Sequence, residues 1–149
     1  MIFDSHIHTK FSADSEMPAA DALARAKSLN LGLVFTEHFD YGLELNGKKF
    51  TFDPAAYMNE YKNLRGDNLR LGVEIGMRKS ARAEIADFIA QADFDFVIGS
   101  IHLVDDFDIY YPEFYVGKDK ATAFSKYFRH MADEAAVTDF DALGHIDYI

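Results

Sequence analysis

Residues 4 to 8 read D-S-H-I-H and directly follow the apolar residues that open the chain. Side chains on an extended strand alternate between its two faces, so His6 and His8 point to the same side. Neutral imidazole is the commonest metal ligand in proteins, and two imidazoles at one strand end can hold one cation. Taken alone, this H-x-H pattern is equally compatible with two incidental surface histidines.

Four later stretches repeat the arrangement, each with a potential metal ligand at the end of a short apolar run. They are Thr36-Glu37-His38, Gly72-Val73-Glu74, G-S-I-H-L-V over Gly99 to Val104, and Gly144-His145-Ile146-Asp147. A series of five ligand-bearing strand ends is hard to explain by incidental histidines. We therefore interpret the series as one metal site, to which His102 and His145 belong as well.

Segments with helical periodicity lie between these apolar runs. The apolar runs predict strands over residues 1–4, 33–35, 69–75 and 96–98, and a fifth that begins at Ala142. Helices are expected to begin at Pro18, after an N-cap at Asp53, at a Ser80 cap, and near Ala121. Long loops are expected over residues 39–52, with Asn46-Gly47 as a turn, and over residues 103–117.

This strict alternation of strand and helix predicts an α/β fold with a parallel sheet and right-handed crossovers. An open doubly wound sheet gathers its site at one switch point, whereas a barrel brings every strand end to one rim. All five strands carry a candidate ligand, so we expect a parallel β/α barrel. About eight strands close such a barrel. We therefore expect residues 1–149 to form a single domain, the N-terminal part of a barrel that continues beyond this chain.

The composition of the chain limits which partners, metal ligands and cellular locations we expect. The formal net charge is −10, which disfavours nucleic acid and anionic membranes as partners, although bound cations can reverse the field within a cleft. The chain has no cysteine, so a metal must be held by His, Asp and Glu. No signal peptide or long apolar run is visible, and we expect a cytoplasmic protein. Phosphate-loop, dinucleotide-binding and nucleophile-elbow motifs are absent.

Single residues leave alternatives open. Glu74 lies between apolar neighbours and needs a partner, which is either a basic residue such as Arg70 or a pair of cations that it bridges. His38 is the better ligand candidate than its neighbour Glu37, because adjacent strand residues face opposite sides. Asp14 is either an ordinary loop residue or a ligand.

Together these motifs resemble the polymerase and histidinol phosphatase (PHP) superfamily, and within it the histidinol-phosphatase branch. The resemblance runs along the whole chain. Its motifs are Asp4-Ser5-His6-Ile7-His8-Thr9, Phe11-Ser12-Ala13-Asp14-Ser15, Phe35-Thr36-Glu37-His38, Gly72-Val73-Glu74-Ile75-Gly76, Gly99-Ser100-Ile101-His102 and Gly144-His145-Ile146-Asp147, with Tyr110-Tyr111-Pro112-Glu113-Phe114 pointing to the branch.

The resemblance implies a distorted seven-stranded β/α barrel, similar to a TIM barrel, with two or three divalent metals of unknown identity (Zn, Mn or Fe). The implied ligands are His6 and His8 for the first metal, Glu74 as a bridge, His102 and His145 for the second, and His38 and Asp14 for the third. Glu74 and His102 are expected to act in catalysis through the metals. The family also has a late Asp-x-His motif that supplies two further ligands. The sequence stops before it, so we expect an isolated chain of this length to bind fewer metals and to act feebly.

The implied function is that of a metal-dependent phosphomonoesterase, a histidinol-phosphatase that hydrolyses L-histidinol phosphate in histidine biosynthesis. The expected partner is a small phosphate monoester, without nucleic acid or membrane, and the oligomeric state is left open. Two alternatives remain at this point. One is a related phosphoesterase that acts on nucleotides or other small phosphate monoesters, and the other is an inactive metal-binding chain.

Overall fold

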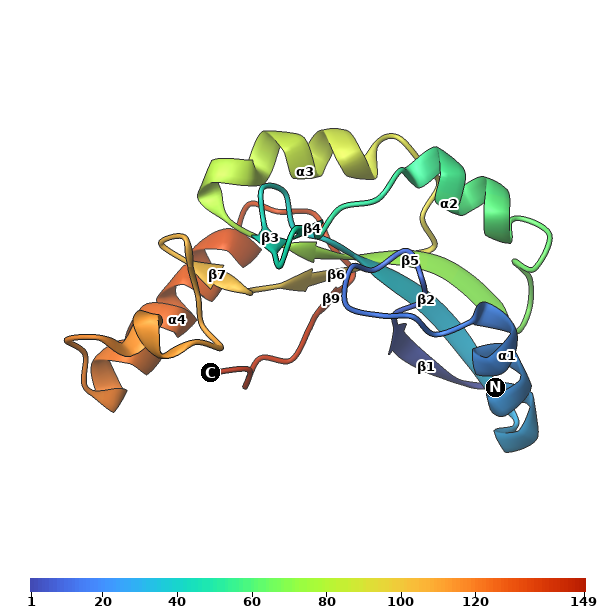
Figure 1. Cartoon of the computed structure of the whole chain (residues 1–149), viewed down its shortest axis with the longest axis horizontal. Helices are drawn as coiled ribbons and strands as arrows, with labels where there is room; N and C mark the ends of the chain where they lie inside the picture. The colour runs from blue at the N-terminus through green and yellow to red at the C-terminus, as the bar shows by residue number, and fades with distance from the viewer.

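The computed structural model describes all residues, Met1–Ile149, and is built around one parallel sheet (Figure 1). The sheet has five strands in the order β1-β2-β5-β6-β9, which is also their order along the chain. The strands are β1 (Ile2–Ile7), β2 (Leu31–Phe39), β5 (Leu69–Gly76), β6 (Phe96–Ser100) and β9 (Ala142–Leu143). All four neighbouring pairs are parallel. Because the strand order never reverses, the sheet has no switch point and is of the barrel type.

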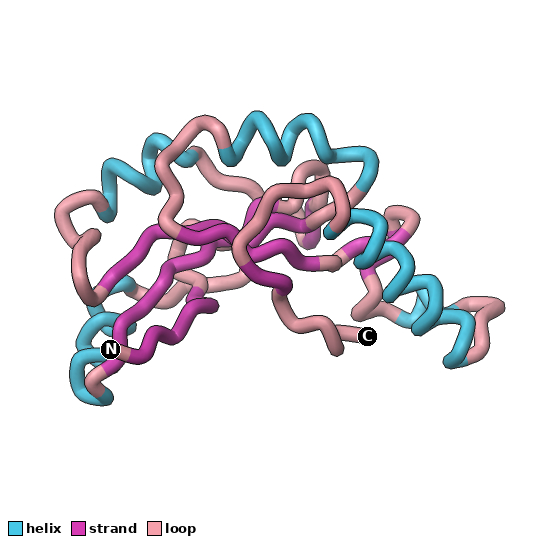
Figure 2. The backbone as a smooth tube through the Cα atoms, turned by 180° about the vertical axis from the view of Figure 1, so that it is seen from behind, coloured by secondary structure: helices cyan, strands magenta, loops and turns pink.

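Four α-helices connect the strands. They are α1 (Ala19–Leu29), α2 (Pro54–Tyr61), α3 (Arg82–Ile89) and α4 (Lys120–Ala135). In both views the strands form a curled, open sheet, and α2 and α3 arch over the same side of it (Figure 2). The predicted β/α barrel class is confirmed, here as a half-barrel of five strands. None of the helices is long and apolar enough to cross a membrane.

Both predicted long loops contain short hairpins. The first pairs β3 (Glu44–Leu45) with β4 (Lys48–Lys49) through the predicted turn at Asn46 and Gly47, which both have positive φ. The second pairs β7 (Leu103–Val104) with β8 (Phe107–Asp108). A 3₁₀ helix, Pro112–Tyr115, follows the second hairpin. Two-residue strands of this kind are too short for periodicity to reveal.

Several predicted element ends are wrong in an informative way. Strand β1 continues to Ile7 and β2 to Phe39, so His6 and His38 lie within strands and not after them. Pairing with the neighbouring strand extends both beyond their apolar cores. Ser80 does not cap α3, since it lies in the 3₁₀ helix Lys79–Ala81 and α3 follows an Ala81 N-cap without a side-chain hydrogen bond. Asp53 caps α2 as predicted.

Two apolar clusters pack on the sheet. The larger lies among β5, β6, α3 and α4 and includes the stacked pair Phe39 and Phe88, with ring centroids 3.7 Å apart. The smaller lies under α1 and α2 and centres on Phe35 and Tyr57, both fully buried. Burial of such large side chains contributes about 1.5–3 kcal/mol each. The core thus holds the strands so that their carboxyl ends converge.

Candidate metal centre

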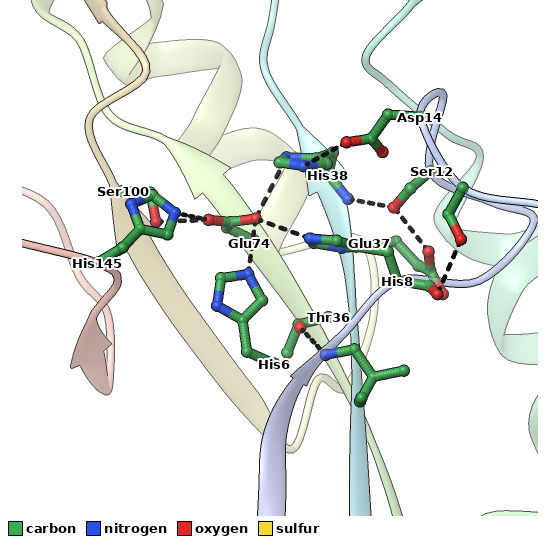
Figure 3. Close-up of polar contacts among 12 residues, drawn as sticks. His6, His8, Ser12, Asp14, Thr36, Glu37, His38, Glu74, Ser100 and His145 are labelled. Atoms are coloured by element: carbon green, nitrogen blue, oxygen red, sulfur yellow. Dashed lines mark hydrogen bonds and ion pairs between the residues drawn. The ribbon is translucent and has the colours of Figure 1, made fainter. Parts of the chain in front are cut away.

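Glu74, near the carboxyl end of β5, is the centre of a cluster of polar side chains at the carboxyl ends of the strands (Figure 3). Its side chain is completely buried. The parallel register sets Glu74 beside His38 of β2 and Ile98 of β6. A buried carboxylate is costly unless charged or hydrogen-bonding groups surround it. In this fold the surrounding groups are imidazoles.

Three histidines approach one carboxylate oxygen, Oε2 of Glu74. Nε2 of His6 lies 3.0 Å away, Nε2 of His8 3.5 Å and Nδ1 of His38 3.2 Å. His8 stacks on His38 with ring centroids 4.3 Å apart. The predicted common orientation of His6 and His8 is thus present. The end of β1 is anchored by the Ile7 N–H, which donates to the hydroxyl of Thr36 in β2, 3.1 Å away.

The other oxygen, Oε1, faces strands β6 and β9. The Ser100 hydroxyl donates to it over 2.7 Å, Nε2 of His145 lies 2.8 Å away and Nε2 of His102 3.3 Å away. The two oxygens of Glu74 therefore point to two separate groups of histidines. A carboxylate placed between two ligand groups has the geometry of a bridge between cations.

Asp14 joins the cluster from the loop after β1. Its Oδ2 lies 3.4 Å from Nε2 of His38, and its side chain is about half exposed. The same ring of His38 therefore faces Glu74 with one nitrogen and Asp14 with the other. The sequence left Asp14 undecided between loop residue and ligand, and the structure brings it to the cluster.

Glu37 has a different environment, although it is adjacent to His38 and also fully buried. Its carboxylate accepts hydrogen bonds from the Thr9 N–H at 2.9 Å, from the Thr9 hydroxyl at 2.6 Å and from the Ser12 hydroxyl at 2.7 Å. Ser12 in turn accepts from the His38 N–H over 2.9 Å. Glu37 thus holds the loop that carries Asp14.

Asp40 is a member of the cluster that the sequence reasoning missed. It is 3 % exposed, and its Oδ1 lies 2.7 Å from Nδ1 of His102 while Oδ2 lies 3.3 Å from Nδ1 of His38. The signal was present, because Asp40 is two residues after His38 and strand alternation turns both to one face. Arg70, the possible basic partner of Glu74, instead contacts the carbonyl of Gly66.

Burial and mutual contacts shift the pKa values in the cluster. Burial acts to raise the pKa of Glu74, but contacts with His102, His145 and His6 outweigh it and hold that pKa well below its usual range. Burial acts to lower the pKa of His38, yet close contacts with the carboxylates of Asp14 and Asp40 raise it to about 10. The raised pKa favours the protonated form of His38 at neutral pH, and a metal bound to that ring would have to displace the proton.

The buried polar atoms without a hydrogen bond fit metal binding. Those within the cluster are Nδ1 of His8, Nδ1 of His38, Oδ2 of Asp40, Oε2 of Glu74 and Nδ1 of His145. In each of three groups, the potential ligand atoms lie within 4.8 Å of one another. The groups are His6 with Glu74 and His145, His8 with His38 and Glu74, and His38 with Asp40 and His102. Imidazole and carboxylate donors at these separations suit zinc, manganese or iron.

The cluster lines a cavity of about 410 Å³. The hairpin of β7 and β8 and the residues after it contribute Asp108, Tyr110 and Tyr111 to its wall, and Tyr148 contributes from the end of the chain. Burial raises the pKa of Tyr148 to about 12, so its hydroxyl is a hydrogen-bond donor at neutral pH. The cavity thus has a nitrogen-rich and carboxylate-rich floor and an aromatic, acidic wall.

All residues predicted for the site lie in this one cavity. They are His6, His8, Asp14, His38, Glu74, His102 and His145. His130 in α4, which lies in none of the potential metal-binding groups, is not among the residues that line it. The convergence is a feature of the structure, whereas the role of each residue as a ligand stays a prediction.

Comparisons with known proteins agree with this geometry. The chain is 38% identical over 150 residues to a probable histidinol-phosphatase of Clostridium acetobutylicum, a match that covers the whole chain and 58% of the relative. It is 32% identical over 154 residues to the histidinol-phosphatase of Lactococcus lactis, covering 98% of the chain and 56% of the relative. The chain thus spans somewhat more than half the length of the curated relatives it matches.

A solved structure is also similar. It is a crystal structure of histidinol phosphate phosphatase from Lactococcus lactis complexed with zinc, L-histidinol and phosphate, and it superposes with a TM-score of 0.90 at 32% sequence identity. The match covers 99% of this chain and 58% of that one. A family model, the PHP domain, matches residues 4–149. The chain therefore belongs to the PHP domain family.

Proposed function

We propose that this protein is a metal-dependent phosphomonoesterase and that its substrate is L-histidinol phosphate. The observation that carries the proposal is the position of Glu74, a buried carboxylate with five imidazoles divided between its two oxygens. Divalent metals held there would neutralise phosphoryl oxygens and supply a nucleophile at neutral pH. The proposal concerns two or three metals, and zinc, manganese and iron all suit these ligands.

The ligand assignments are those that the resemblance to the PHP superfamily implies. We assign His6 and His8 to a first metal, with His102 and His145 at a second, and Glu74 bridging the two. His38 and Asp14, whose side chains lie 3.4 Å apart, are assigned to a third. The hydroxyl of Ser100 donates a hydrogen bond to Oε1 of Glu74 over 2.7 Å, which supports the orientation of this carboxylate.

The cavity wall supports a leaving group like histidinol. Such a leaving group carries an ammonium and an imidazole, which are a cation and an aromatic ring. Asp108 offers a carboxylate to the cation, and Tyr110 and Tyr111 offer aromatic faces and hydroxyls. The two relatives named histidinol-phosphatase and the similar complex with L-histidinol and phosphate favour the same substrate.

Phosphate release from a panel of monoesters tests the proposal. The purified protein is stripped with a chelator, reconstituted with zinc, manganese or iron(II), and given L-histidinol phosphate, a nucleoside monophosphate and a sugar phosphate. The Lactococcus lactis histidinol-phosphatase serves as the positive control. We expect metal-dependent release, fastest with L-histidinol phosphate. Preference for another monoester would replace the substrate, and no release from a metal-loaded protein would overturn the phosphatase function.

A further inference from the structure

Asp40 lines the cavity, and the burial of its carboxylate costs free energy. The side chain is 3 % exposed, and no arginine or lysine is paired with it. Its two oxygens instead meet the Nδ1 atoms of two different histidines, His102 at 2.7 Å and His38 at 3.3 Å. A buried carboxylate of this kind destabilises a fold unless its neighbours compensate for the lost solvation.

The orientation of the two rings is the same relative to Asp40. In His102, Nδ1 faces Asp40 and Nε2 is turned to Oε1 of Glu74, 3.3 Å away. In His38, Nδ1 lies 3.3 Å from Oδ2 of Asp40 and 3.2 Å from Oε2 of Glu74, and Nε2 is turned to Asp14, 3.4 Å away. A histidine that donates its Nδ1–H to a carboxylate keeps the lone pair on Nε2 and is thereby fixed in the ligand tautomer.

Gly76, at the end of β5, provides the space for this carboxylate. A Cβ atom at Gly76 would lie 1.8 Å from Oδ1 of Asp40 and 2.6 Å from its Cγ. Real Cβ atoms do not approach other atoms so closely, so any side chain at position 76 would displace Asp40. The second glycine of the Gly72-Val73-Glu74-Ile75-Gly76 motif is thus explained by Asp40 and not by a turn.

We propose that Asp40 is a positioning residue, which fixes the rings of His102 and His38 with Nε2 toward the metals, in a space that Gly76 keeps free. One carboxylate then orients ligands of two of the three assigned metals. The inference rests on the metal centre proposed above. Removing a carboxylate that orients a ligand typically weakens metal affinity about 10- to 100-fold.

A double-mutant cycle on zinc affinity tests this. The zinc dissociation constants of wild type, Asp40→Ala, Gly76→Ala and the double variant are measured by competition with a chromophoric chelator. We expect about 10- to 100-fold weaker affinity for each single variant. In the Asp40→Ala background the clash is gone, so Gly76→Ala should cost no further affinity. Gly66→Ala is the matched control, since a Cβ at Gly66 meets no atom within 4 Å.

A spectroscopic readout separates positioning from general loss of stability. In the zinc-loaded wild type, the Nδ1–H of His102 should give a nitrogen-bound proton signal protected from exchange with water, and Asp40→Ala should remove it. Asp40→Asn keeps the size of the side chain and guards against misfolding of the alanine variant. Unchanged zinc affinity in Asp40→Ala and Asp40→Asn, or additive losses in the cycle, would overturn the inference.

These outcomes are independent of substrate. A zinc-loaded wild type that releases no phosphate would overturn the proposed function, while the cycle would still report on Asp40. Conversely, an active enzyme with unaltered zinc affinity in the Asp40 variants would leave the function standing and remove the positioning role.

Discussion

Two fully buried glutamates on neighbouring strands have opposite environments. Glu37 of β2 is surrounded by hydroxyl and amide donors from Thr9 and Ser12, and Glu74 of β5 is surrounded mainly by imidazoles. Burial acts to raise the pKa of both. It prevails for Glu37, whose pKa stays above its usual range despite the hydrogen bonds from Thr9 and Ser12. At Glu74 the histidines prevail, and the pKa falls well below that range.

The difference between these environments separates a carboxylate with a structural role from a candidate metal ligand. Hydroxyl and amide donors are permanent partners, so the region around Glu37 is complete without a ligand. An imidazole either donates a proton or presents a lone pair, so the region around Glu74 is able to exchange protons for metal ions. The two residues are of the same type and equally buried, yet Glu37 holds a loop in place and Glu74 lies in a candidate metal centre.

The largest expected effect is that of Glu74→Gln. The amide keeps the shape but removes the negative charge that two groups of histidines share. A loss of roughly 4 kcal/mol of transition-state stabilisation corresponds to about a 1000-fold fall in kcat. Steady-state phosphatase assays with metal analysis check this, and circular dichroism should show a preserved fold. Turnover within tenfold of wild type would contradict the bridging role.

The second largest expected effect is that of metal removal, which should distinguish the region around Glu74 from the region around Glu37. We expect chelation to abolish activity and to lower the free energy of unfolding by about 3 kcal/mol, relative to protein in zinc at about 100 times its dissociation constant. Thermal unfolding with and without zinc measures the shift. Glu74→Gln should show a much smaller shift and Glu37→Gln a shift close to that of wild type. An equal zinc-dependent shift in both variants would mean that Glu74 contributes no more to zinc binding than Glu37.

Much of the fold follows from the sequence because its signals are local. The apolar runs and helical stripes correctly indicate the five parallel strands and four helices, and the distribution of ligands over all strands correctly favours the barrel type. The errors concern ends and short elements. Extension of β1 to Ile7 depends on pairing with β2, and the hairpin of β7 and β8 on a two-residue turn at Asp105 and Asp106.

The candidate site is less completely predictable for the same physical reason. His6, His8, His38, Glu74, His102 and His145 could be proposed because each lies at the end of an apolar run. The spacing of Asp40 from His38 indicates a shared face, but the contact of Asp40 with His102 spans 62 positions in sequence and could not be predicted. The role of Gly76 depends on the position of Asp40 in the folded protein, so the sequence alone does not indicate it.

Glu37→Gln should mainly affect stability. The amide cannot accept all the hydrogen bonds that Thr9 and Ser12 donate, and its NH₂ group faces donors instead of acceptors. An unsatisfied buried polar group costs about 1–3 kcal/mol. Urea unfolding measures the loss, and kcat of the folded, zinc-loaded variant should stay within a few-fold of wild type. Thr9→Val removes one hydroxyl donor and should cost less, while a loss of kcat as large as that of Glu74→Gln would make Glu37 part of the reaction.

The smallest expected effect is a difference in pH dependence. The pKa of Glu37 is raised from an ordinary value of 4.5. Between 4.5 and the raised value the folded state binds the proton more tightly than the unfolded state, so stability from Glu37 decreases as pH rises through that window. The pKa of Glu74 is lowered from 4.5, so its contribution is present above 4.5 and disappears as pH falls through the lowered value.

Replacement of glutamate by glutamine should therefore change the pH dependence of the free energy of unfolding in opposite directions at positions 37 and 74. Urea unfolding in chelator is compared for wild type, Glu37→Gln and Glu74→Gln from about pH 4 to 6, where ordinary histidines are still largely protonated. With rising pH, wild type should lose stability relative to Glu37→Gln and gain it relative to Glu74→Gln. The differences between proteins cancel the titration of groups that contact neither glutamate. Slopes of the same sign would mean that the two buried carboxylates are alike, and that the histidines around Glu74 do not favour its charged form.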